Sequence, residues 1–205
     1  MRYSDTHKSE THEKILKIAS RALREKGPDK LAVAEVMQAA GLTHGGFYAH
    51  FKSKDALLTE TLNAIFVHSK KRYGRLIEGL PPRHALATFI DFYVSPAHRD
   101  NLTGGCAIVA LNSDLPRQSR KFRDVFDDGV KRLSATLAGL IREADIDRDG
   151  EALAASILSA MAGAVAVSRA VSDKRLSDEM LDSARASIKT RLGLTDAALS
   201  GSPVQ

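Results

Sequence analysis

The chain has 205 residues, of which 43% are hydrophobic and 27% charged, and its formal net charge is +5. This composition is close to that of ordinary soluble globular proteins. No segment reaches the roughly 20 uninterrupted apolar residues of a membrane span, and the polar N-terminus lacks a secretion signal. The single cysteine, Cys106, excludes an intrachain disulfide. We therefore expect a cytoplasmic protein with no membrane partner.

The positive charge is concentrated near the N-terminus. Residues 1–54 hold ten Lys and Arg against six Asp and Glu, together with four of the seven His. Such a concentration is typical of a module that binds a polyanion, although many basic segments are only solvated faces.

Helical periodicity runs along the whole sequence, and no segment is convincing as a strand. A first amphipathic helix carries Ile15, Ala19 and Leu23 and ends at Gly27-Pro28-Asp29. Ser53 is a candidate N-cap for a long helix that extends to about Arg72. The other expected helices cover 33–40, 43–50, the segment from Leu86 to Tyr93 after Pro81-Pro82, the apolar turns 106–111, the segment after Pro116 up to Asp145, 152–171 and 177–192.

The pattern predicts an all-α protein of about nine helices. Residues 1–54 are expected to form a three-helix, helix-turn-helix DNA-binding domain, and residues 55–193 a helical bundle for ligand binding and dimerisation. The small, polar tail 194–205 is expected to be disordered.

The segment LAVAEVMQAAGLTHGGFYAHF has the layout of a helix-turn-helix. The first helix of this motif is expected to bury Val33, Val36 and Met37. Gly41 suits the positive φ of a sharp turn, and Leu42 would fill the space between the helices. Thr43 would cap the second helix.

The second helix of this motif begins with two glycines, Gly45 and Gly46. Each costs about 1 kcal/mol of helix propensity relative to Ala, which is understandable if the backbone must approach a phosphate closely. His44 is best aimed at base edges, and the Thr43 hydroxyl at a phosphate. Alternatively, the glycines extend a loop and the aromatic residues belong to the core. The expected DNA-binding residues are Thr43, His44, Gly45, Gly46, Phe47, Tyr48, His50, Lys52 and Lys54.

The stretch AAGLTHGGFYAHFKSKDALL resembles the signature of the tetracycline-repressor-like (TetR) family of bacterial regulators, and the close match covers residues 11–58. One departure is Leu31-Ala32, where the family commonly places a Thr or Ser cap. The stretch from Tyr93 to Phe126 is similar to a subgroup of these regulators without naming a ligand. The resemblance implies DNA contact by Thr43, His44, Gly45, Tyr48, His50 and Lys54.

The second half of the chain is expected to hold a small-molecule effector between its helices. The alternative for every one of these residues is an ordinary place in the core. The expected lining consists of Ile65, Phe66, Phe89, Phe92, Tyr93, Cys106, Val109, Phe126 and Met161.

Cys106 follows two glycines near a helix start, and it is a candidate sensor of electrophiles or oxidants. His98, Arg99 and Lys121 are possible sources of nearby positive charge. The alternative is a buried residue that serves packing alone.

Small residues are frequent in two late helices, Ala152–Val171 and Ser177–Leu192. They would let helices approach closely and are expected to form a homodimer. Alternatively, they face the effector.

We expect no metal, no cofactor and no enzymatic activity. Asp145, Asp147, Asp149 and Gly150 imitate the start of a calcium loop, but the twelfth position is Ser156 where the loop needs Glu, and Asp149 is better placed as a helix N-cap. A helical enzyme that uses Cys106 and His98, or a non-specific DNA-binding protein, are the alternatives. The sequence favours a ligand-responsive transcriptional repressor, which binds a pseudo-palindromic operator in double-stranded DNA as a homodimer and is released by a small apolar or electrophilic effector.

Overall fold

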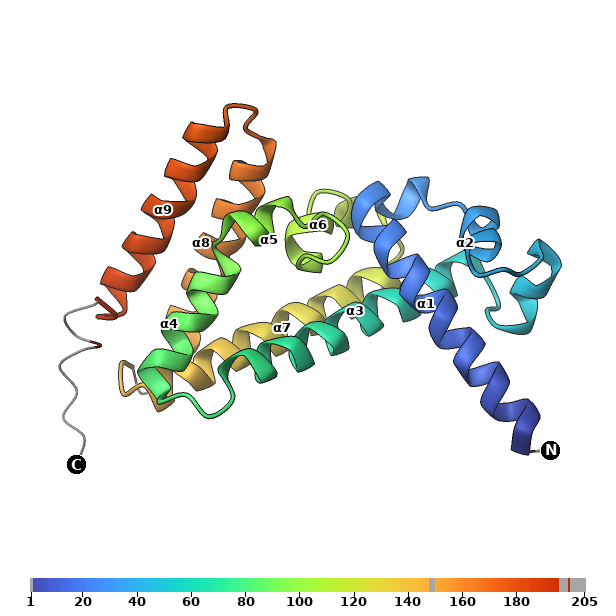
Figure 1. Cartoon of the computed structure of the whole chain (residues 1–205), viewed down its shortest axis with the longest axis horizontal. Helices are drawn as coiled ribbons and strands as arrows, with labels where there is room; N and C mark the ends of the chain where they lie inside the picture. The colour runs from blue at the N-terminus through green and yellow to red at the C-terminus, as the bar shows by residue number, and fades with distance from the viewer. Residues whose placement is uncertain (1, 148–149, 196–198, 200–205) are drawn as a thin grey trace. The chain divides into compact units, whose positions relative to one another are not determined.

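The structure is a computed structural model that describes residues 2–147, 150–195 and 199 (Figure 1). All secondary structure in these residues is helical, which confirms the all-α prediction. There are nine α-helices and two 3₁₀ turns in this part of the chain: α1 Arg2–Lys30, α2 Val33–Ala39, η1 His44–Ala49, α3 Lys54–Ile77, α4 Pro82–Tyr93, α5 Pro96–Asp100, α6 Ala107–Leu111, η2 Leu115–Arg117, α7 Arg120–Glu143, α8 Glu151–Ala170 and α9 Lys174–Arg191.

The chain forms two compact units. The first contains residues up to Ser69 and the segment Leu102–Gly129, and the second contains Lys70–Asn101 and the residues from Val130 onward. This division differs from the predicted segments 1–54 and 55–193, because residues 55–69 and 102–129 pack with the N-terminal helices. The separation of a DNA-binding from a ligand-binding part stays a functional prediction.

In the first unit, α1 is kinked where the sequence predicts its end. Gly27 has a φ of 77°, and Pro28 starts one further turn up to Lys30. Ile15, Ala19 and Leu23 are completely buried along one face of α1. This helix packs on α2 and on α6.

In the second unit, α8 and α9 form an antiparallel pair (orange and red in Figure 1). The helix α9 ends in a Schellman motif, in which Leu194 N donates to Lys189 O at 2.8 Å and Gly193 has a φ of 61°. Leu194 is completely buried, so this first residue of the predicted disordered tail is part of the core. Residues 196–198 and 200–205 of that tail lie outside the described residues.

The helix α8 is long and apolar enough to span a membrane, with a mean hydropathy of 1.6. It contacts α9 and α5, and its Ile157, Met161 and Val165 are completely buried. Such burial is expected of the core helix of a globular bundle.

The polar segment after Ser95, which none of the expected helices covers, contains the helix α5. Its start is stabilised by the Ser95 hydroxyl, which accepts from His98 N at 3.1 Å, and by Pro96 in the first turn. Its end is held by Arg99, whose side chain is only 3% exposed. The Arg99 guanidinium donates to Ser177 Oγ at 2.7 Å and to Asp178 Oδ1 at 2.5 Å. These tertiary bonds to α9 explain why helical periodicity does not reveal α5.

Candidate nucleic-acid interface

The turn between α2 and η1 is a second Schellman motif. Gly41 N donates to Gln38 O and Leu42 N to Met37 O, both at 2.9 Å. The φ of Gly41 is 76°, which confirms the predicted left-handed conformation. Leu42 is half-buried, as expected for the apolar residue that follows such a glycine. The motif reverses the chain within three residues and directs the backbone into η1.

The second helix of the motif is a 3₁₀ helix, His44–Ala49, and the predicted side-chain cap at Thr43 is wrong. Thr43 occupies the N-cap position, but its side chain makes no capping hydrogen bond. The tight first turn is closed by the backbone instead, because Gly46 N donates to Thr43 O at 3.1 Å. The exposed hydroxyl of Thr43 therefore remains available to an external acceptor or donor.

The two glycines of η1 are not required by the protein's own packing. A Cβ atom on Gly45 would meet nothing within 4 Å. A Cβ atom on Gly46 would make ordinary contacts at 3.8 Å with Met37 and Thr43. Neither glycine has a positive φ. Since the fold tolerates a side chain at Gly45, its absence favours close approach by another molecule.

The aromatic residues of this segment divide between core and surface. Phe47 is 3% exposed and its ring stacks on Phe51, with centroids 5.7 Å apart. Phe47 thus occupies the core position that the sequence left as its alternative, and its side chain is not part of the exposed surface of η1. Tyr48 points outward and is 71% exposed.

The remaining expected DNA-binding residues lie around the surface of η1. Lys52 is exposed, whereas Lys54 is half-buried and donates from Nζ to Asp29 O at 3.1 Å. Ala32 stands at the N-cap of α2 without a side-chain hydrogen bond, so the cap that the sequence lacks is not replaced. Five of the expected residues are exposed, and together they are called the exposed face of η1: Thr43, His44, Gly45, Tyr48 and Lys52.

Sequence reasoning missed a group of residues beside this face. Lys8, Ser9 and His12 of α1 line an open surface hollow together with Ala49 and His50. The available signal was the spacing of Lys8 and His12, which places both on one side of a helix.

Five of the expected effector-binding residues belong to the first unit: Ile65, Phe66, Cys106, Val109 and Phe126. The Phe66 ring lies against Gly129, where a Cβ atom would come within 2.2 Å of it. It also meets Phe126 edge-on, with centroids 6.1 Å apart. Both rings have a packing role that accounts for their positions without a ligand.

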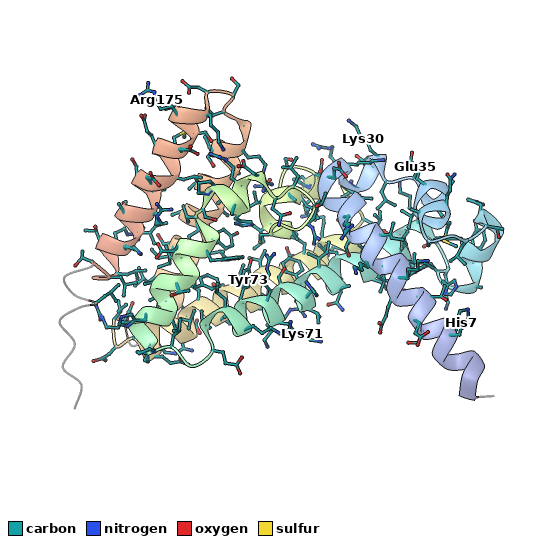
Figure 2. The ribbon with its side chains drawn as sticks, in the orientation of Figure 1. His7, Lys30, Glu35, Lys71, Tyr73 and Arg175 are labelled. Carbon is teal, nitrogen blue, oxygen red and sulfur yellow. The ribbon has the colours of Figure 1, made fainter. Side chains whose placement is uncertain are left out.

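The other four, Phe89, Phe92, Tyr93 and Met161, belong to the second unit. Tyr73, which sequence reasoning missed, meets Phe89 edge-on at 5.1 Å. Figure 2 shows Tyr73 directed between α3 and α4, whereas Lys71 points away from α4. The Arg72 guanidinium lies over the Phe92 ring at 5.2 Å. This unit therefore has an aromatic interior with a cationic group beside it.

Cys106 is buried at the N-cap of α6, the short helix that packs on α1. Arg99, one of the expected sources of positive charge, is held by Asp100 and Asp178.

A shallow apolar hollow of about 490 Å³ runs along the outer face of α8 and α9. Val167 and Leu176 are 50% and 45% exposed there. Small residues flank them, namely Gly163, Ala164, Ser183 and Ala184. Exposed apolar side chains between small residues are characteristic of a helix–helix interface.

No group of three or more potential metal ligands occurs among the described residues. In the calcium-like segment, Asp149 lies outside these residues, and Gly150 is the N-cap of α8. Ser156 accepts a hydrogen bond from Arg191 at 3.1 Å.

His98 is a buried histidine that is neutral at physiological pH. Burial lowers its pKa to about 4; the hydrogen bond to Tyr93 O opposes this shift, and Arg169 and Arg72 add to it. The neutral ring carries its proton on Nδ1, which donates to Tyr93 O at 2.6 Å.

We predict that stability decreases in mild acid because of His98. The unfolded chain takes up a proton near pH 6.5 and the folded chain only near pH 4, so stabilisation present above pH 6.5 is lost as the pH falls to 4. The loss at pH 4 is about 3 kcal/mol. Urea denaturation across this range should show a shallower decrease for His98→Gln than for the wild type, and equal slopes would contradict the assignment.

Two family models match the chain. Residues 15–61 match the bacterial regulatory proteins of the tetR family, and residues 82–184 match the tetracyclin repressor-like C-terminal domain. The HTH-type transcriptional regulators YvdT and YerO of Bacillus subtilis are 33% and 32% identical over 92 and 126 residues. These segments cover 43% and 58% of this chain and 47% and 41% of the relatives, so the chain spans less than half of either relative's length.

Solved structures with the same fold cover nearly the whole chain. Reduced NemR of E. coli has a TM-score of 0.77 at 19% identity, covering 88% of this chain and 96% of its own. A TetR transcriptional regulator from Chloroflexus aurantiacus has a TM-score of 0.76 at 24% identity, covering 94% and 97%. The two family models together match more than half of the chain, and the chain belongs to the tetR family of bacterial regulatory proteins.

Proposed function

We propose that this protein is a ligand-responsive repressor, which binds a pseudo-palindromic operator as a homodimer and leaves it when an effector binds. The observation that carries the proposal is the exposed surface of η1, where Gly45 leaves the backbone uncovered by a side chain. Tyr48 and Lys52 extend into solvent beside it. A polyanion can approach the Gly45 backbone closely, and the basic excess of the N-terminal segment favours its association.

In this proposal the residues of the exposed face have different roles. His44, at the first position of η1, reads base edges in the major groove. Thr43, Tyr48 and Lys52 contact backbone phosphates. These contacts orient the N-terminal helices on the DNA but do not distinguish one base sequence from another. His50 and Lys54, at the margin of the face, contact phosphates as well.

Replacement of His44 by Ala is expected to change which sequences the protein prefers. Lys52→Ala is the matched control and should weaken binding to all sequences alike, because it removes only a phosphate contact. Selection from a pool of random duplexes, followed by fluorescence anisotropy on the selected sites, distinguishes the two effects. A His44→Ala protein that selects the wild-type sequences with uniformly lower affinity would exclude His44 as a base reader.

The homodimer is proposed to form through the outer face of α8 and α9. Two copies of this face would cover the apolar hollow and the exposed Val167 and Leu176 side chains. A two-fold dimer presents two copies of η1, which explains a preference for a pseudo-palindrome.

We predict that Leu176→Glu converts the dimer into a monomer, because the carboxylate would be desolvated at the centre of the contact. Leu80, 40% exposed and outside this face, provides the control substitution Leu80→Glu. Sedimentation velocity should show a monomer for the first variant and a dimer for the second. A Leu176→Glu protein that remains dimeric would place the interface elsewhere.

The effector is proposed to be a small apolar molecule or an electrophile, acting in the cytoplasm. Cys106 supports the second possibility, since it begins the helix that packs on α1. Alkylation or oxidation of the buried sulfur would enlarge this residue and displace α6 from α1. NemR, which shares the fold, has been solved in a form described as reduced. No enzymatic role is proposed.

A further inference from the structure

A surface hollow of about 350 Å³ lies between the N-terminal turns of α1 and the end of η1. Its lining consists of Lys8, Ser9, His12, Ala49 and His50. Lys8 and His12 are one turn apart on α1 and therefore lie on the same side of the helix. The short side chain of Ala49 leaves the hollow open opposite them. Nearly every side chain that faces it can donate a hydrogen bond or carry positive charge.

The ring of His12 is held in a fixed orientation. It stacks on Phe51, with centroids 4.6 Å apart and planes 25° apart. Its Nε2 lies 3.0 Å from Glu60 Oε2 on α3. Because an ionised carboxylate only accepts hydrogen bonds, Nε2 must be the nitrogen that carries the proton.

The second imidazole, His50, lies 6.1 Å from His12 between ring centroids. Its Nδ1 atom is buried and has no hydrogen-bond partner in the described part of the protein. A buried ring nitrogen without a hydrogen-bond partner destabilises the folded protein unless another molecule forms a hydrogen bond with it. Burial lowers the pKa of His50, and the charges of His12 and Lys8 lower it further. The surroundings of His50 are thus electropositive and would be stabilised by an anion.

We propose that this hollow binds a phosphate group of the DNA backbone next to the bases that η1 reads, and that proton uptake by His50 strengthens this contact. The inference rests on the proposed function as a DNA-binding protein. It adds α1 to the DNA interface and makes operator binding sensitive to mild acid.

Charge and position support a phosphate as the occupant. The titratable groups that face the two rings are Lys8 on α1, Glu60 on α3, and the partner imidazole. With His50 protonated, its imidazolium and the Lys8 ammonium outnumber the single carboxylate of Glu60, and this set of side chains attracts an anion. The hollow adjoins the C-terminal end of η1, so the backbone of a duplex that reaches His44 also passes nearby. His12, His50 and Glu60 do not form a metal-binding group.

The sign of the pH dependence follows from these contacts. An imidazolium binds a phosphate more strongly than a neutral imidazole, so the pKa of His50 is higher in the complex than in the unbound protein. Affinity for DNA must then increase as the pH falls through the range between these two values. Burial holds the pKa of the unbound His50 below its usual value, so the increase continues as the pH falls toward that lowered pKa.

The test measures binding of the full chain to a selected duplex by fluorescence anisotropy at constant ionic strength. The wild-type affinity is expected to rise about tenfold from pH 7.5 to pH 5.5. His50→Gln should lose most of this gain and keep its sequence preference. His7, an exposed histidine on α1 outside the hollow, provides the control His7→Gln, which should behave as the wild type (Figure 2).

Lys8→Gln supplies a second measurement that does not depend on the histidines. The slope of log affinity against log salt concentration should become shallower by about 1, as expected when one phosphate contact is lost. An unchanged slope, or a full gain in acid for His50→Gln, would overturn the proposed site. Specific but pH-independent DNA binding by the wild type would overturn it too and leave the proposed function intact. Failure of the wild type to bind any duplex at pH 7.5 and low salt would contradict the proposed function itself.

Discussion

The position of η1 is the constraint on which the DNA-binding face depends. Six residues in a 3₁₀ conformation are too few to be stable alone, so tertiary contacts must hold them. The Schellman turn at Gly41 fixes where the segment begins, and burial of Phe47 and Phe51 fixes its inner side. Because α2 and α3 define both ends of the segment, η1 keeps its position without a side chain at Gly45 on its outer side.

Electrostatics around this face complement its shape. Stacking on Phe51 holds the ring of His12 in place. A buried aromatic residue of the core therefore fixes a side chain that lines the hollow beside η1. The same packing that stabilises the short helix therefore positions groups that can contact a phosphate. In the proposed repressor, an effector must disturb this arrangement. The contact between α6 and α1 connects Cys106 to the N-terminal helices within one compact unit.

Local signals in the sequence predict the fold well where they act through the backbone. Gly41 and Pro81-Pro82 mark helix ends, and Ser53 Oγ accepts from Ala56 N at 3.1 Å near the start of α3 as a cap should. Features that depend on distant partners were not predictable. The helix α5 relies on Arg99 bonds to α9, and the division into two units relies on packing of α6 against α1. Likewise, Lys8 and His12 gain their significance only from the placement of His50.

In the proposed function, Gly45 lacks a side chain because DNA must approach its backbone. The most direct measurement is the affinity of Gly45→Ala for a duplex selected by the wild type, compared with Gly74→Ala, an exposed glycine of α3 that also has nothing within 4 Å of an added Cβ. We expect Gly45→Ala to lose affinity by about tenfold or more, or roughly 1.4 kcal/mol, with stability equal to or above that of the wild type. Equal affinities for the two variants would contradict it.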